Sequence, residues 1–179
     1  FGSEYQKLSS SGLDKENTSV SVLLEKGSTL EKKMVITISR EYGSGGRYVG
    51  KLLAESLNIP FYDKELIHLT SQSSGLGEVY IKKTEQKLST AKFEGNNDDR
   101  IFLSEEKVIK KLAKNSCVIV GRCADYILKD NPDVISIFLY SDDESKVKRA
   151  VKYYHIEEKD ARKKIKKINQ ERAKHYLYY

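Results

Sequence analysis

The stretch MVITISREYGSGGRYVGKLLAESL, residues 34–57, sets the fold that we expect for this chain. Residues 35–38 form a strand-like run, residues 43–46 form a glycine cluster, and the remainder has the apolar spacing of an amphipathic helix. This order is typical of a buried parallel strand that leads into a phosphate-binding loop, because glycines let backbone N–H groups surround an oxyanion and the helix N-terminus adds partial positive charge. The residues that we expect to bind phosphates are Gly43, Ser44, Gly45, Gly46, Arg47 and Tyr48.

The glycine cluster matches the phosphate-loop pattern G-x-x-x-x-G-K-[ST] only in part. Gly46 occupies the second glycine position, whereas Glu41 stands at the first. Arg47 replaces the lysine and keeps its charge, and Tyr48 replaces the small hydroxyl residue that normally reaches Mg²⁺. A dinucleotide-binding pattern fails as well, because Tyr48 stands at its third glycine position. A glycine-rich turn that binds no ligand therefore stays open as the alternative.

Three segments give the chain a wider resemblance. They are SREYGSGGR at 39–47, IPFYDKEL at 59–66 and VIVGRCADYIL at 118–128, and a basic helical tail follows them. In this order they resemble the cytidylate kinase-like family, whose members are related to bacterial cytidylate kinases among the P-loop nucleoside monophosphate kinases. The resemblance covers residues 35–179. It implies an α/β fold with a doubly wound parallel sheet, and a helical lid at about residues 142–179.

The alternation of strands and helices also favours this fold class from the residues alone. We expect strands at 35–38, 61–62, 118–120 and 134–140, within one kinase-like domain spanning residues 34–179. Residues 1–33 are rich in Ser, Gly, Glu and Lys, and we expect this leader or extension to lie outside the core. Related kinases have a further strand after the lid, and we expect that strand to be absent from a chain that stops at Tyr179.

The net charge of +6 is unevenly distributed. Residues 144–174 hold 12 Lys and Arg against 5 Asp and Glu, so the rest of the chain is close to neutral. A basic segment on a neutral body favours a phosphorylated ligand, and less specifically nucleic acid. We expect small-molecule nucleotides as partners rather than nucleic acid or a membrane, since no apolar run approaches 18 residues. The two cysteines show no disulfide or zinc spacing, which favours a cytoplasmic protein.

Candidate site residues follow several of the expected strands, where ligands of open parallel sheets gather. Asp63 follows the second strand, and it fits a helix N-cap as well as the resemblance, which implies contact with the acceptor nucleotide. Arg122 follows the third strand, and the resemblance implies a clamp on the acceptor phosphate; a surface salt bridge is the alternative. After the fourth strand, Ser141 and Glu144 have the spacing of a helix capping box.

The remaining candidates depend more heavily on the resemblance. It implies acceptor-binding roles for Arg100 and Asp125, which otherwise fit a solvated helix end and the first turn of a helix. It also implies that lid arginines reach the transferring phosphoryl group, and Arg162 and Arg172 are our candidates besides Arg47 and Arg122. The alternative for each lid arginine is a solvated helix face.

The resulting hypothesis is a transferase, an ATP-dependent nucleoside monophosphate kinase acting on CMP or dCMP. Phosphoryl transfer normally needs Mg²⁺, and the usual protein anchors are missing here. We therefore expect Mg²⁺ to arrive as Mg-ATP with no direct protein ligand, its waters held by Glu41, Asp63 and Asp125. Two alternatives remain: a nucleotide-binding module with little or no catalysis, favoured by the altered loop, and a nucleic-acid-binding protein that uses the basic tail.

Overall fold

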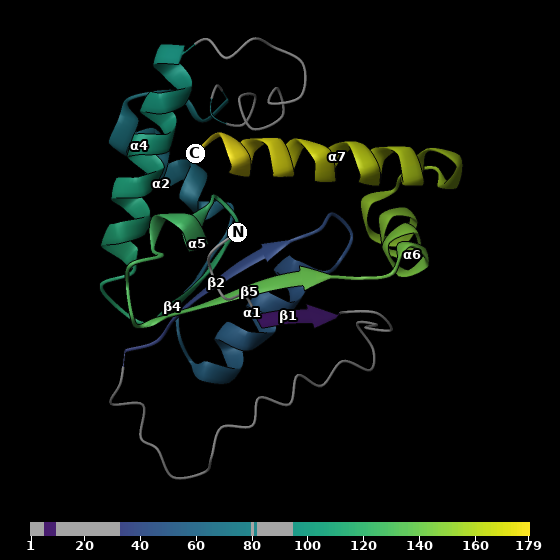
Figure 1. Ribbon diagram of the computed structural model, residues 1–179, viewed down its shortest axis with the longest axis horizontal. Coiled ribbons are helices and arrows are strands. Elements are labelled where there is room, and N and C mark those ends of the chain that lie inside the picture. Colours follow the sequence, from purple (N-terminus) through teal and green to yellow (C-terminus); the bar gives the residue numbers. More distant parts are fainter. Residues whose placement is uncertain (1–5, 10–32, 80, 82–94) are drawn as a thin grey trace.

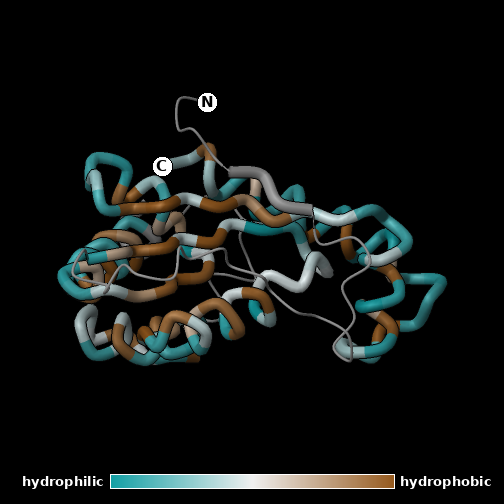
Figure 2. The backbone as a smooth tube through the Cα atoms, turned by 90° about the horizontal axis from the view of Figure 1, so that it is seen from below, coloured by the Kyte–Doolittle hydropathy of each residue, from teal (hydrophilic) through white to brown (hydrophobic). Residues whose placement is uncertain are grey.

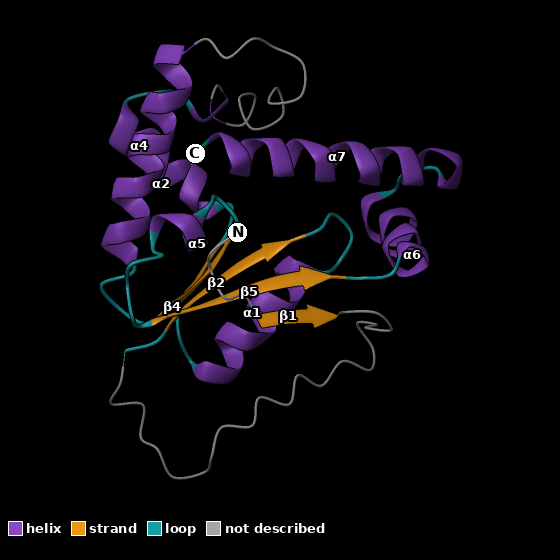
Figure 3. Ribbon diagram, in the orientation of Figure 1, coloured by secondary structure: helices purple, strands orange, loops and turns teal. Residues whose placement is uncertain are grey.

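A computed structural model describes residues 6–9, 33–79, 81 and 95–179. Its strands are all parallel and lie in the order β1-β5-β2-β4-β3. Figure 3 labels β1, β5, β2 and β4. The strands are β1 (Gln6–Ser9), β2 (Val35–Arg40), β3 (Phe61–Tyr62), β4 (Cys117–Val120) and β5 (Val134–Tyr140). The helices are α1 (Gly46–Leu57), α2 (Glu65–Ser74), α4 (Gly95–Leu112), α5 (Ala124–Ile127), α6 (Asp143–Tyr154) and α7 (Glu158–Tyr178).

The sheet is doubly wound, as the sequence predicts. All four residues of β4 are buried, because β4 lies between β2 and β3 and has helices on both faces. One face packs on α1 through a cluster that includes Ile38, Leu53 and Val120. The opposite face packs on α2, α4 and α5 through a cluster that includes Ile109 and Ile119. Figure 2 shows these hydrophobic segments in the interior and hydrophilic residues toward the periphery.

The first strand corrects the expectation for residues 1–33. Gln6–Ser9 pairs in parallel with β5 and forms an edge of the sheet, so this piece of the leader belongs to the domain. The segment QKLS is short and mostly polar, and nothing in its pattern marks it as a strand. It pairs with β5 in the register that runs from Gln6 opposite Ile137 to Ser9 opposite Tyr140. The other residues before position 33 lie outside the described part of the chain.

Helix α7 crosses the carboxyl ends of the strands. It leaves α6 at one side of the sheet and ends beside α4 at the other (Figure 1). Near its beginning, Ala161 and Ile165 pack with Val147, Ala150 and Ile156 in a small cluster against α6. The long basic segment is therefore helical and lies over the part of the sheet where ligands of this fold class gather.

Two helix caps differ from expectation. The N-cap residue of α2 is Lys64, with no side-chain hydrogen bond, so Asp63 does not cap this helix. The N-cap residue of α6 is Asp142, whose Oδ1 accepts from the Ser145 N–H at 2.8 Å, in place of the predicted Ser141. In both cases the displaced residue is used in a tertiary contact that sequence spacing does not reveal. None of the described helices is long and apolar enough to cross a membrane.

Candidate functional site

The glycine loop connects the end of β2 to the start of α1. It therefore lies at the carboxyl end of a strand and at a helix N-terminus, the position in which this fold class binds anions. Gly43 and Gly45 have φ of +82° and +84°, a backbone region that favours glycine. A Cβ at Gly43 would come within 3.0 Å of the Lys146 carbonyl oxygen, so α6 lies directly against the loop. Helix α1 starts at Gly46 and its N-cap residue Gly45 makes no side-chain cap, which leaves the first-turn N–H groups to other acceptors.

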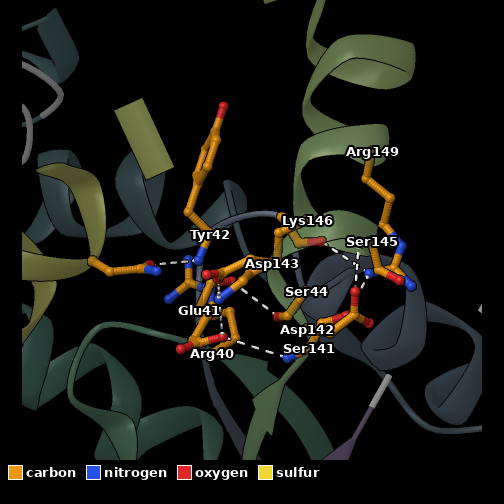
Figure 4. A network of polar contacts seen from close by, with 12 residues as sticks. Arg40, Glu41, Tyr42, Ser44, Ser141, Asp142, Asp143, Ser145, Lys146 and Arg149 are labelled. Atoms are coloured by element: carbon orange, nitrogen blue, oxygen red, sulfur yellow. Dashed lines mark hydrogen bonds and ion pairs between the residues drawn. The ribbon is translucent and has the colours of Figure 1, made fainter. Parts of the chain in front are cut away.

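Polar side chains of α6 form a network of contacts with the glycine loop (Figure 4). Lys146 Nζ lies 3.0 Å from Glu41 Oε2 and 2.8 Å from Asp143 Oδ1, and its side chain is only 7% exposed. Burial lowers the pKa of Lys146, but its hydrogen bonds to the two carboxylates outweigh burial and leave that pKa raised. Arg149 Nη1 donates to the Gly43 carbonyl and to Ser141 Oγ, both at 3.1 Å. Neither Lys146 nor Arg149 was predicted as a supporting cation, because their contacts with the loop depend on how α6 packs against it.

Arg47 and Asp63 are brought together by the fold. Arg47 Nε lies 3.0 Å from Asp63 Oδ2, which joins the start of α1 to the end of β3. Arg47 is about half exposed, whereas Asp63 is largely covered. Since Asp63 does not cap α2, its carboxylate is available for this contact. The predicted ATP side and the predicted acceptor side of the site therefore meet at this ion pair.

Arg40, the last residue of β2, is the main residue that sequence reasoning missed. Its side chain runs between two glycines that belong to different motifs. A Cβ at Gly46 would stand 2.8 Å from Arg40 Cγ, and a Cβ at Gly121 would stand 2.9 Å from Arg40 Cζ. The available signal was the position of Arg40 inside SREYGSGGR, directly before the loop.

The turn after β4 is strained. Gly121, Arg122 and Cys123 all have positive φ, at +80°, +60° and +50°. Left-handed backbone costs a non-glycine residue about 1 kcal/mol or more, and such residues cluster at functional sites. Arg122 Nη1 donates to Glu105 Oε1 on α4, and both side chains are buried, at 11% and 5% exposed. The salt bridge of Arg122 is therefore largely covered rather than on the surface, and it lies at a strand end.

Arg172 reaches the site from α7. Its Nη1 donates to the Arg40 carbonyl at 3.1 Å, and its guanidinium lies 5.8 Å from the centre of the Tyr42 ring. Burial, followed by the nearby charge of Arg40, lowers the pKa of Arg172 to about 9. Arg172 therefore remains charged at neutral pH at an energetic cost that an anion would reduce.

The other predicted residues occupy different positions. Arg162 is exposed on α7, and its charge, after that of Lys146, helps to lower the pKa of Asp143. Arg100 is exposed and donates to the Ser74 carbonyl at 2.8 Å, which ties α4 to α2 beside a depression of about 340 Å³. Asp125 is buried in α5, and its charge adds to the effect of burial, which is the main cause of the raised pKa of the Cys123 thiol.

The carboxyl-terminal half of α7 docks on the strand ends through several contacts. Asn169 Oδ1 accepts from the Tyr42 N–H at 2.7 Å, and His175 Nδ1 lies 3.4 Å from Cys123 Sγ. Burial and the charge of Arg122 lower the pKa of His175 to about 4. Farther along, Tyr179 stacks on Phe102 of α4 with ring centroids 3.7 Å apart. The contacts seal α7 against the glycine loop and against the turn after β4.

The site as a whole combines a glycine loop with arginines from four parts of the chain, Arg40, Arg47, Arg122 and Arg172. Such an arrangement can bind several phosphate groups at once. Among the described residues, no group of three His, Cys, Asp or Glu side chains is placed to bind a metal ion. Glu41 and Asp63 are each paired with a cation. These residues fit a Mg²⁺ ion carried by nucleotide phosphates better than a metal held by protein ligands.

The chain belongs to the cytidylate kinase-like family, whose sequence pattern matches residues 35–179. Among solved structures, an uncharacterized protein from Eubacterium ventriosum is 35% identical, with a TM-score of 0.62, and the match covers 82% of this chain and 78% of that one. No curated protein matches the sequence.

Two further solved structures are more distant. A gluconokinase from Sinorhizobium meliloti is 17% identical with a TM-score of 0.48, and the match covers 76% of this chain and 74% of that one. A shikimate kinase from Aquifex aeolicus is 24% identical with a TM-score of 0.45, covering 81% and 83%. At these scores neither adds to the assignment. Family membership supports a nucleotide-binding, kinase-type function for this chain.

Proposed function

We propose that this protein transfers a phosphoryl group from ATP to a nucleoside monophosphate, with CMP or dCMP as the acceptor. The observation that carries the proposal is the convergence at the strand ends of a glycine loop with an uncapped helix start and Arg40, Arg47, Arg122 and Arg172. Such a set provides what phosphoryl transfer chiefly requires, which is positioning and neutralisation of charge. The choice of cytidine nucleotides comes from the family.

The proposed mechanism assigns each element one task. Backbone N–H groups of the glycine loop bind ATP phosphates, and the contact of Arg149 with the Gly43 carbonyl keeps the loop in shape. Arg122 binds the acceptor phosphate, and Glu105 fixes the plane of its guanidinium. Arg172 approaches the transferring group when α7 covers the site, which also excludes water. Mg²⁺ would enter with ATP and neutralise charge on its phosphates.

A coupled assay tests the proposal directly. Purified protein is incubated with Mg-ATP and, separately, CMP, dCMP, UMP, AMP or GMP, and the ADP formed over many turnovers is measured. We expect ADP formation that depends on CMP or dCMP and disappears when EDTA removes Mg²⁺. ADP formation that no nucleoside monophosphate increases would contradict the proposed reaction.

A second candidate function is a nucleotide-binding module with little or no catalysis. Two observations favour this function. The acidic side chains of Glu41 and Glu105 already form ion pairs, with Lys146 and Arg122 respectively. In addition, Tyr48 replaces the hydroxyl residue expected near Mg²⁺. Such a module would bind ATP or CMP in calorimetry and would release no more than one equivalent of ADP per protein. The number of turnovers therefore separates the two functions.

A further inference from the structure

We propose that Arg40 binds a phosphate group of the nucleotide held by the glycine loop, and that it shares this phosphate with Arg172 of α7. The inference rests on the proposed function and deepens it, because it identifies a phosphate-binding residue that couples loop occupancy to the docking of α7. Neither the loop pattern nor the sequence analysis assigns a role to Arg40.

The Arg40 side chain fills a space that two glycines border. Gly46 and Gly121 flank it, and a Cβ at either position would come closer to Arg40 than normal contacts allow. Gly46 is the first residue of α1, and its N–H belongs to the first turn of that helix. The space between Gly46 and Gly121 therefore directs the Arg40 guanidinium toward the turn after β4. This position lies between the glycine loop and that turn, the two segments to which the mechanism assigns phosphate groups.

Positive charges of Arg172 and Arg122 lie near Arg40. Arg172 donates to the Arg40 carbonyl, so the two residues meet at the end of β2, and the charge of Arg40 disfavours the charged form of Arg172. Burial raises the pKa of the Cys123 thiol, and the charges of Arg122 and Arg40 both act to lower it. Arg122 therefore lies near Cys123, as Arg40 does. The acids that face these groups are Asp63, Asp125 and Glu105, and two of them already form ion pairs, with Arg47 and Arg122.

Burial and the charge of Arg40 disfavour the charged form of Arg172, whereas the charge of Asp63 favours it, and the pKa of Arg172 stays lowered overall. A phosphate group carries up to two negative charges and accepts the paired N–H groups of a guanidinium in a fixed geometry. Binding of phosphate would therefore relieve the repulsion between Arg40 and Arg172, and in that way favour the docked position of α7. This gives the lid a direct link to the presence of nucleotide in the loop.

A purely structural role for Arg40 is the competing explanation, since its aliphatic stem fills the space between Gly46 and Gly121. The variant Arg40→Met keeps an unbranched apolar side chain in that space and removes the charge, whereas Arg40→Lys keeps the charge without the planar fork. Lys166→Ala is the control, because Lys166 is exposed on α7 and has no place in the site. Calorimetry with ATP and with inorganic tripolyphosphate measures affinity, and the melting temperature without ligand measures stability.

We expect Arg40→Met to weaken the binding of both probes about 10- to 100-fold, with Arg40→Lys in between and Lys166→Ala unchanged. The melting temperature without ligand should stay near that of the wild type. Combining Arg40→Met with Arg172→Met should cost less affinity than the two single changes together, because the two residues share one ligand. Wild-type affinity in Arg40→Met, or additive losses, would overturn the proposal. So would equal losses in the Met and Lys variants accompanied by a fall in melting temperature.

The two proposals fail in different ways. If no nucleoside monophosphate yields ADP and tripolyphosphate binding still requires Arg40, the proposed reaction is wrong and the phosphate site stands. If Arg40→Met phosphorylates CMP with unchanged KM for ATP, the reaction stands and the role of Arg40 is wrong.

Discussion

The two halves of α7 differ in charge and in what they contact. Residues 158–167 carry most of the positive charge of the helix, and all the basic side chains in this half are exposed, namely Lys159, Arg162, Lys163, Lys164, Lys166 and Lys167. This half packs on α6 through Ala161 and Ile165. Residues 168–178 have fewer charges, yet Asn169, Arg172 and His175 reach the strand ends. Charge density therefore marks the solvated half, and the half with the contacts is the one that covers the site.

Replacing one arginine in each half should give the largest contrast. Arg172→Ala removes a cation that lies at the glycine loop, and we expect kcat to fall about 1000-fold, as for other arginines that act on a transferring phosphoryl group. Arg162→Ala should lower kcat far less, because Arg162 is exposed beside Asp143. Steady-state kinetics with saturating ATP and CMP measure both. Equal losses would show that the whole helix approaches the substrates.

The turn beneath the carboxyl-terminal half offers the second test. Arg122→Ala should raise the KM for CMP about 100-fold and change the KM for ATP little, because a bidentate phosphate contact is lost on the acceptor side alone. Removing Arg122 also leaves Glu105 buried without its cation, which costs stability. The double variant Arg122→Ala/Glu105→Gln corrects for this loss. If both KM values rise equally in the double variant, Arg122 has only a structural role.

The third test uses pH. The pKa of His175 falls from 6.5 when unfolded to about 4 when folded, so the unfolded chain takes up a proton first as pH decreases. The contribution of this group is therefore fully present above pH 6.5 and is lost as pH falls toward 4, by about 2 kcal/mol at about pH 5. His175→Gln should remove this part of the slope in denaturant titrations between about pH 7.5 and pH 5. An unchanged slope would mean that His175 is not held neutral against Cys123.

Amide exchange should reveal the smallest difference. When ATP and CMP are both present, we expect exchange in residues 168–178 to slow about tenfold, because nucleotide would stabilise the docked contacts. Exchange in residues 158–167 should change less, since Ala161 and Ile165 pack on α6. Mass spectrometry on proteolytic peptides distinguishes the two halves. Uniform slowing along α7 would show that the helix responds as one unit.

Much of the fold follows from local patterns. The apolar runs identify β2, β4 and β5, and Phe61–Tyr62 was predicted as a strand with the observed bounds. The prediction succeeds for β4 and for the first four residues of β2 because central parallel strands are buried on both faces and so are continuously apolar. β5 is only partly buried, and its β-branched and aromatic residues identify it instead. The strand β1 was missed because its sequence carries no such pattern, and it is recognised only by its pairing with β5.

The site was less predictable, because its contacts join residues far apart in the sequence. The glycine loop and the position of Arg122 follow from spacing after strands, a local property. The support of the loop by Lys146 and Arg149 depends on how α6 lies against it. The role of Asp63 was ambiguous for the same reason: an Asp before a helix is a good cap, and only the tertiary structure shows that it contacts Arg47 instead.

The aromatic residues along α7 have an optical consequence. The chain contains 12 tyrosines and no tryptophan, so its near-ultraviolet absorption and emission come mainly from phenol rings. Several of these rings meet where α7 docks: Tyr42 lies beside Tyr154 and Arg172, Tyr126 beside Tyr176, and Tyr179 beside Phe102 and His175. Undocking of α7 would change the surroundings of these rings together. The protein thus carries an intrinsic spectroscopic reporter of the docking of α7, which can be followed in real time without a label.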